Sequence, residues 1–342
     1  MKAVVLRGVN DLRLEELPDP EPTDKEVLIR IRAVGICGTD VDMWEGTNKE
    51  GTFPFIPGHE WVGDVIKVGR KIKSLSVGDR VVGECFLPCH ICPNCKDGMS
   101  PAMCINPKYY GFAWETPGGM AEYHVSEEER LHKIPDTLTY EEAALVEPIS
   151  VAYHGIWGVG GGVAPHDRVV IFGCGPIGLC ALLICKVAGA FTVAVEPQPF
   201  RRKLAKDLGA DVVVDPSEEK FVMEIMDCTK NRGATLVLEC SGSDVALAAS
   251  VEVVAKEGRI VLIGHSVGRK VPIEIGKSIW QGAKIFGSCD SPFFIPKTLD
   301  FMARKLADFT KIITYRFPLA QALTAFETAR DNPEAVKILL IP

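Results

Sequence analysis

Short strand-like runs, separated by turn residues, dominate the first 150 positions of the chain. Val27–Val34 (VLIRIRAV) and Arg80–Gly83 (RVVG) are examples, and glycine, proline and aspartate fill the intervals between such runs. β-Branched and other apolar residues bounded by turn formers are typical of strands. This region is therefore predicted to be an all-β module.

From about Val151 the pattern changes to apolar runs that alternate with longer helical segments. The predicted strands are Arg168–Phe172, Thr192–Glu196, Asp211–Val214, Thr235–Glu239, Arg259–Ile263 and Lys284–Gly287. The predicted helices are Pro176–Gly189, Pro199–Gly209, Glu218–Thr229 and Ser243–Ala255. Such alternation indicates a doubly wound parallel sheet. The first helix is apolar on nearly every side, so we expect it to be buried.

The length of the chain, 342 residues, exceeds the size at which a single core keeps growing, so two domains are expected. After Lys284 the chain is expected to return to the first domain through Ser291–Pro296 and a helix near Ala320–Ala329. The fold class is thus α/β. The predicted boundaries are 1–150 for the β-rich domain, 151–288 for the doubly wound domain and 289–342 for the return.

The net charge of −7 argues against a nucleic-acid or anionic-membrane surface, because both need clustered positive charge. A small-molecule partner is expected instead. The longest apolar run, Ile177–Cys185, is about half the roughly 20 residues that a membrane span needs, and the amino terminus is charged too early for a secretory signal. With no export signal, the twelve cysteines are interpreted as reduced thiols or metal ligands in a cytoplasmic protein.

Four closely spaced cysteines, Cys89, Cys92, Cys95 and Cys104, lie in the segment PCHICPNCKDGMSPAMC. Four thiolates can surround Zn²⁺ as a tetrahedron, and a closed site of this kind stabilises a loop without taking part in chemistry. We therefore predict a structural zinc lobe at about residues 85–105. Cys85 lies four residues before Cys89, so five thiols compete for four positions, and the set that ends at Cys104 is chosen.

A glycine fingerprint, Gly173-Cys-Gly175-Pro176-Ile177-Gly178, follows one predicted strand and opens the next helix. In this context the first glycine makes a tight turn, the second lets the backbone approach a pyrophosphate, and the third permits close helix packing. The phosphates would lie at the positive amino terminus of the helix. The fingerprint predicts a dinucleotide cofactor.

Glu196 ends the next predicted strand, 18 residues after Gly178. A carboxylate there can accept hydrogen bonds from both hydroxyls of the adenosine ribose, and it would repel a 2′-phosphate. This favours NAD over NADP. Arg201 and Arg202 leave NADP open, since either could pair with the phosphate, although arginine can equally lie over the adenine ring.

A second metal site is suggested by Cys37 in GICGTD, by His59 and Glu60 in PGHEW, and by Glu147 in VEP. Each residue alone is ordinary, because cysteine and histidine are often core residues and glutamate often forms ion pairs. Together, a thiolate, an imidazole and a carboxylate can bind Zn²⁺ and leave a fourth position open. Trp44 and Lys108–Tyr110 could line a substrate pocket or could pack in the core.

In these motifs the chain resembles the zinc-dependent medium-chain dehydrogenases, and within them the polyol branch of sorbitol, threonine and sugar-alcohol-phosphate dehydrogenases. The resemblance covers nearly the whole length. It rests on Gly35–Asp40, Gly58–Gly63 continuing to Gly69, the four-cysteine lobe, Val146–Pro148 and the glycine fingerprint.

The resemblance implies a GroES-like catalytic domain, an inserted Rossmann coenzyme domain, an active-site cleft between the two, and a homodimer or homotetramer. It also implies two zinc ions per chain, the catalytic one held by Cys37, His59 and either Glu60 or Glu147. Either carboxylate could bind directly while the other holds the metal-bound water. Asp42 stands where several relatives carry a relay histidine.

The expected reaction is hydride transfer between NAD and a secondary alcohol, either a polyol, a sugar alcohol or its phosphate. The metal would acidify the alcohol, and Thr39 and then Asp42 are candidates to carry its proton. Thr39 could equally serve only to stabilise the turn beside Asp40. The alternatives are a threonine or simple alcohol dehydrogenase with the same chemistry, and an inactive zinc-stabilised binding protein.

Overall fold

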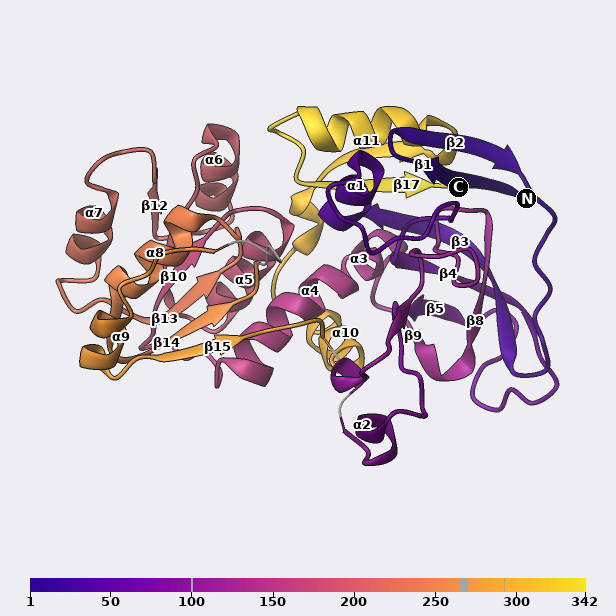
Figure 1. Cartoon of the computed structure of the whole chain (residues 1–342), viewed down its shortest axis with the longest axis horizontal. Helices are drawn as coiled ribbons and strands as arrows, with labels where there is room; N and C mark the ends of the chain where they lie inside the picture. The colour runs from indigo at the N-terminus through magenta and orange to yellow at the C-terminus, as the bar shows by residue number, and fades with distance from the viewer. Residues whose placement is uncertain (100, 265–269, 292) are drawn as a thin grey trace. The chain divides into compact units, whose positions relative to one another are not determined.

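The computed structural model describes residues 1–99, 101–264, 270–291 and 293–342. These residues form two compact units (Figure 1). Unit 1 comprises Met1–Glu147, Ile295–Arg304 and Ile313–Pro342, and unit 2 comprises Pro148–Phe294 and Lys305–Ile312. In the described part of the chain, no helix is both long enough and apolar enough to cross a bilayer.

Unit 1 is built on a seven-stranded sheet with the order β16-β17-β3-β4-β5-β9, and β8 also pairs with β3. The strands are β3 (Glu26–Ile36), β4 (Glu60–Val68), β5 (Arg80–Gly83), β8 (Tyr123–Glu127), β9 (Leu131–Lys133), β16 (Ile313–Pro318) and β17 (Lys337–Ile341). Two further antiparallel sheets have two strands each: β1 (Lys2–Gly8) pairs with β2 (Asp11–Glu16), and β6 (Phe86–Leu87) pairs with β7 (Lys108–Tyr109). Strand β17 therefore lies beside β3, although some 300 residues separate them in sequence.

The first 150 residues, expected to be an all-β module, are β-rich rather than purely β. The helices that lie wholly within them are α1 (Gly38–Glu45), α2 (Pro93–Lys96) and α3 (Tyr140–Ala144), with 3₁₀ turns at Pro101–Met103 and Glu128–Arg130. The rest of unit 1 adds α10 (Ile295–Ala303), α11 (Ala322–Asp331) and a 3₁₀ turn at Leu319–Gln321. Helices α1 and α3 begin with side-chain caps. The carboxylate of Asp40 accepts the amide of Cys37, and Thr139 and Glu142 cap each other reciprocally. These caps stabilise short helices that the strand-like pattern concealed.

Unit 2 contains a six-stranded parallel sheet with the order β12-β11-β10-β13-β14-β15, which confirms the predicted doubly wound sheet. Its strands are β10 (Arg168–Phe172), β11 (Phe191–Val195), β12 (Val212–Val214), β13 (Ala234–Glu239), β14 (Val254–Leu262) and β15 (Lys284–Gly287). Its helices are α5 (Pro176–Val187), α6 (Pro199–Asp207), α7 (Phe221–Cys228), α8 (Asp244–Val253) and α9 (Ile275–Gln281). Helix α4 (Val146–Tyr153) continues into a π-helical stretch at His154–Val159, and a 3₁₀ turn spans Phe309–Ile312.

Burial in unit 2 follows the sequence pattern closely. Every residue from Gly178 to Cys185 in α5 is buried, which confirms the prediction for that helix. The predicted bounds of the strands and helices in unit 2 agree with the observed ones to within three residues, except at the start of one strand. Strand β14 begins at Val254 and not at Arg259, because α8 ends at Val253 and the chain passes directly into a strand with a register shift opposite β13.

Candidate metal centre and nucleotide site

Three of the predicted zinc ligands come together in unit 1. Cys37 follows β3, His59 precedes β4, and Glu60 is the first residue of β4. Because β3 and β4 are antiparallel neighbours, one ligand atom from each side chain lies within 4.8 Å of the other two. His59 and Glu60 are buried and Cys37 is half-buried. This donor set, with its soft thiolate, imidazole and carboxylate, fits Zn²⁺.

Glu147 is placed differently. It is half-buried near the start of α4, and among the described residues the metal-binding group contains Glu60 and not Glu147. Its charge nevertheless acts on Lys337, which contacts Glu60 directly. Burial lowers the pKa of Lys337, but the charges of Glu60, Cys37 and Glu147 outweigh this and raise it. Lys337 is therefore charged, and sequence reasoning missed it.

Asp40 is a second residue that sequence reasoning missed. Its buried carboxylate accepts hydrogen bonds from the amide of Cys37 at 3.0 Å and from that of Gly58 at 3.2 Å. Its Oδ1 lies 3.7 Å from Nδ1 of His59, which is too long for a hydrogen bond but close enough for charge attraction. Burial lowers the pKa of His59, and the charges of Asp40 and Cys37 outweigh it and raise the pKa well above its ordinary value. The sequence offered one signal for this contact, because Asp40 ends the GTD motif beside Cys37 and His59 lies in the GHE motif.

The two proton-relay candidates differ in position. The hydroxyl of Thr39 lies 3.7 Å from the sulfur of Cys37, so Thr39 lies directly beside the metal-binding group. Asp42 is exposed on α1. Trp44 is buried, packs edge to face on Phe326 and lies under the guanidinium of Arg330, which supports the core alternative for this residue.

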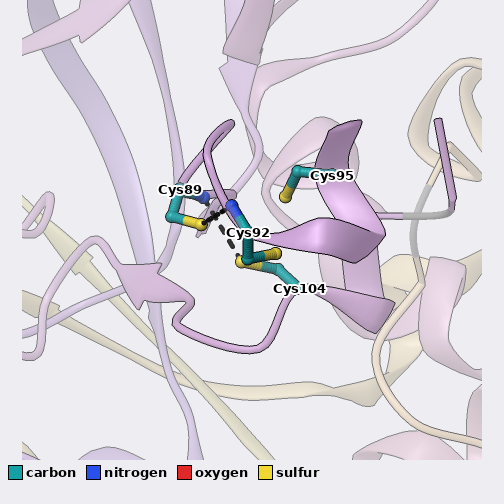
Figure 2. A group of neighbouring side chains, drawn as sticks. All are labelled: Cys89, Cys92, Cys95 and Cys104. Carbon is teal, nitrogen blue, oxygen red and sulfur yellow. Dashed lines mark hydrogen bonds between the residues drawn. The ribbon is translucent and has the colours of Figure 1, made fainter. Parts of the chain in front are cut away.

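The four-cysteine lobe forms a second cluster. One sulfur from each of Cys89, Cys92, Cys95 and Cys104 lies within 4.8 Å of the others, and Figure 2 shows the four side chains directed toward a common centre. The backbone amide of Cys92 donates to the sulfur of Cys89, and that of Cys89 to the sulfur of Cys104, both at 3.3 Å. Cys85 is outside this group, and its carbonyl accepts the amide of Tyr110.

Protonation in the lobe is uneven. Backbone hydrogen bonds from the segments at Ile105 and Cys95 lower the pKa of Cys92 to about 6. Burial, together with the neighbouring thiols, raises the pKa of Cys95 to about 12. A metal ion entering the lobe must therefore displace protons. Four thiolates at this spacing fit a closed tetrahedral Zn²⁺ site with no open position.

The glycine fingerprint lies at the carboxyl end of β10. Gly173 has a φ of 87°, in the left-handed region, and a Cβ there would lie 2.8 Å from Cβ of Ser241. A Cβ on Gly178 would lie 1.8 Å from the carbonyl oxygen of Gly173. Gly175 meets no atom within 4 Å, and Pro176 and Ile177 begin α5 after it. The space above Gly175 thus lies at a helix amino terminus, where phosphates bind.

Glu196 follows β11, next to the fingerprint. Its buried carboxylate accepts the amide of Cys174 at 2.7 Å and the amide of Gln198 at 3.0 Å. Arg202 donates to the carbonyl of Glu196 at 2.8 Å and pairs with Asp215 at 2.8 Å. Arg202 is thus already engaged within the protein. Arg201 is half-buried on α6.

Glu239 ends β13, the strand on the other side of β10, and sequence reasoning missed its role. Its buried carboxylate accepts the amides of Ser241 at 2.8 Å and Gly242 at 2.9 Å. It thereby fixes the loop against which Gly173 packs. The sequence signal for this role was an acidic residue at the end of a predicted strand, the same feature that singled out Glu196.

Comparisons with known proteins agree with this geometry. Residues 23–136 match the alcohol dehydrogenase GroES-like domain, and residues 176–303 match the zinc-binding dehydrogenase domain. D-arabitol-phosphate dehydrogenase of Enterococcus avium is 32% identical over 97% of this chain and 94% of its own. Sorbitol dehydrogenase of Homo sapiens is 34% identical over 99% of this chain and 95% of its own. The chain belongs to the polyol branch of the zinc-dependent medium-chain dehydrogenases.

A solved structure supports the same assignment. A proposed zinc-binding dehydrogenase from Sinorhizobium meliloti 1021, bound to NADP, superposes with a TM-score of 0.93 at 30% identity and covers 100% of this dehydrogenase and 99% of its own chain. The family assignment makes the present chain an oxidoreductase. It confirms the GroES-like and Rossmann folds that the resemblance implied.

Proposed function

We propose that this dehydrogenase transfers hydride between NAD and a secondary alcohol of a polyol, a sugar alcohol or a sugar-alcohol phosphate. The observation that carries the proposal is the convergence of Cys37, His59 and Glu60 in a chain whose relatives include sorbitol and D-arabitol-phosphate dehydrogenases. The donor set is that of a catalytic zinc site with an open position.

Two zinc ions per chain are proposed, one at this group and one in the four-cysteine lobe. When bound at the first site, zinc supplies Lewis acidity that lowers the pKa of the substrate hydroxyl. Cys37, His59 and Glu60 would hold the metal, and Glu147 would orient a water molecule beside it. Thr39, next to the sulfur of Cys37, accepts the alcohol proton as it gives its own hydroxyl proton to the carboxylate of Asp42, an exposed residue of α1 that releases the proton to solvent.

NAD is proposed as the coenzyme in preference to NADP. Gly173, Gly175 and Gly178, with Pro176 and Ile177, are proposed to bind the pyrophosphate. The carboxylate of Glu196 accepts one amide on each oxygen, and each oxygen keeps a further lone pair for a ribose hydroxyl. Arg202 donates to the carbonyl of Glu196 and pairs with Asp215, and Arg201 is proposed to lie along the adenosine.

A homo-oligomer is also proposed. Strand β15 ends the described order of the sheet in unit 2, and an edge strand invites pairing with another chain. Near it, Ile275, Ile279, Trp280 and Ile285 are exposed, Trp280 at 82%. An apolar group of this kind beside a sheet edge suits a second copy of the chain. Trp280→Glu is expected to lower the mass measured by light scattering, and an unchanged mass argues against this surface.

The proposed function is tested by assaying oxidation of polyols, their phosphates, threonine and short alcohols with NAD and with NADP. Activity confined to polyols or their phosphates is expected, and it should disappear in Cys37→Ala. Turnover that persists in that variant contradicts the metal assignment. A reducing, cytoplasmic setting is proposed as well, because the metal-ligating thiols must stay reduced.

A further inference from the structure

Lys337, Gly35 and Glu60 lie on three adjacent strands of the unit 1 sheet. Glu60 begins β4 and faces Gly35 of β3, while Lys337 begins β17, where the next residue faces Ile36 of β3. Lys337 must therefore reach across the whole width of β3 to contact Glu60. The strand order β17-β3-β4 brings together two charges that are 277 residues apart in sequence.

The ammonium group of Lys337 donates three hydrogen bonds. Its Nζ donates at 2.7 Å to each carboxylate oxygen of Glu60, and at 3.0 Å to the carbonyl of Ile36. Both side chains are 1% exposed. Because a buried charge is costly unless it is paired and hydrogen-bonded, each of these residues depends on the other.

Gly35 provides the space for the pair. A Cβ at position 35 would lie 2.0 Å from Oε2 of Glu60 and 3.2 Å from its Cδ. Any side chain on β3 at this point would therefore occupy the place of the carboxylate. The backbone of Gly35 is strand-like, outside the left-handed region, so the reason for a glycine here is space and not conformation.

We propose that Gly35 and Lys337 are positioning residues that hold the carboxylate of Glu60 beside Cys37 and His59. The proposal rests on the proposed function only in taking these three residues as the metal site. Each carboxylate oxygen has two lone pairs, so an oxygen that accepts a hydrogen bond from Lys337 can still offer a lone pair to a metal ion. Without Lys337 the buried carboxylate loses both hydrogen bonds that fix its orientation, and it turns away from the other two ligands.

The test measures metal affinity. Zinc in the full-length protein is titrated with a chelator, and Cys37→Ala, which keeps only the lobe, marks the zinc that belongs to the second site. We expect Lys337→Met and Gly35→Ala to weaken the catalytic zinc about 10- to 100-fold, the range usual for residues that hold a metal ligand. Lys337→Arg, which keeps the cation, should stay within about tenfold of the wild type. Gly8→Ala, whose Cβ meets no atom within 4 Å, is the matched control for glycine replacement.

A double-mutant cycle separates positioning from general destabilisation. If Lys337 acts through Glu60, Lys337→Met should cost less than about threefold in zinc affinity when Glu60 is already Gln. Retention of the lobe zinc and an unchanged circular dichroism spectrum show that each variant is folded. The proposal is overturned if Lys337→Met binds the catalytic zinc as tightly as the wild type, or if its cost is the same in the Gln background. A protein that oxidises no polyol yet passes the cycle would contradict only the proposed function.

Discussion

The backbone amide of Cys174 donates a 2.7 Å hydrogen bond to Oε2 of Glu196, which joins the middle of the glycine fingerprint to the end of the neighbouring strand. The carboxylate thus holds the loop at which the pyrophosphate is proposed to bind, and it is also the group proposed to bind the ribose. One buried side chain therefore links the two parts of the proposed nucleotide site.

Replacement of Glu196 should change coenzyme choice. Glu196→Gln removes the charge that repels a 2′-phosphate but keeps an oxygen that can accept the amide of Cys174. We expect kcat/KM with NAD to fall about tenfold and the preference for NAD over NADP to shrink. Steady-state kinetics with both coenzymes measure this. An unchanged ratio would show that Glu196 does not determine coenzyme choice.

Two fingerprint glycines should respond differently to alanine. Gly178→Ala places a Cβ 1.8 Å from the carbonyl of Gly173, so both folding stability and NAD binding should decrease. Gly175→Ala meets no protein atom within 4 Å, so its melting temperature should stay within about 2 °C while NAD binding weakens. Calorimetry of unfolding and of NAD binding separates the two effects. Normal NAD binding by Gly175→Ala would contradict the proposed pyrophosphate position.

Removal of one lobe cysteine should cost one zinc ion. Cys92→Ser breaks the four-thiolate group, so the protein should retain a single zinc and lose several degrees of melting temperature. Cys85→Ala is the matched control, because Cys85 lies outside the group, and it should retain two. Elemental analysis after dialysis measures the difference. Loss of zinc from Cys85→Ala as well would mean that the lobe uses a different set of thiols.

Acid stability should depend on His124, whose ring lies 4.4 Å from that of Trp61 in the core of unit 1. Burial lowers the pKa of His124 to about 3, whereas an unfolded histidine has a pKa of about 6.5. Between these values only the unfolded state binds this proton. The stability gained from the neutral ring is thus complete above pH 6.5 and is lost as the pH falls toward 3.

His124→Leu cannot take up this proton. The slope of its unfolding free energy between about pH 4 and 6 should therefore be shallower than that of the wild type by up to about 1.4 kcal/mol per pH unit. Urea denaturation at several pH values, followed by tryptophan fluorescence, measures both slopes. Parallel slopes would show that His124 is protonated in the folded state.

The sequence predicts local features well and distant pairings poorly. The strands of unit 2 are apolar runs bounded by turns, and β10 and β15 have the predicted bounds. Lys337 could not be foreseen as a partner of Glu60, because the register of three strands and the missing side chain of Gly35 decide the contact. Trp44 shows a second limit, because the sequence alone cannot distinguish an aromatic residue that packs in the core from one that binds substrate.

Strand β17 has a consequence for biosynthesis. Glu60 leaves the ribosome long before Lys337, and the whole coenzyme-binding unit is translated between them. At ordinary elongation rates of about 5–20 residues per second, Glu60 waits some 14–55 seconds for its cation. If the pair with Lys337 is needed to hold Glu60 beside Cys37 and His59, we expect the proposed metal site to be completed only after β17 has been synthesised.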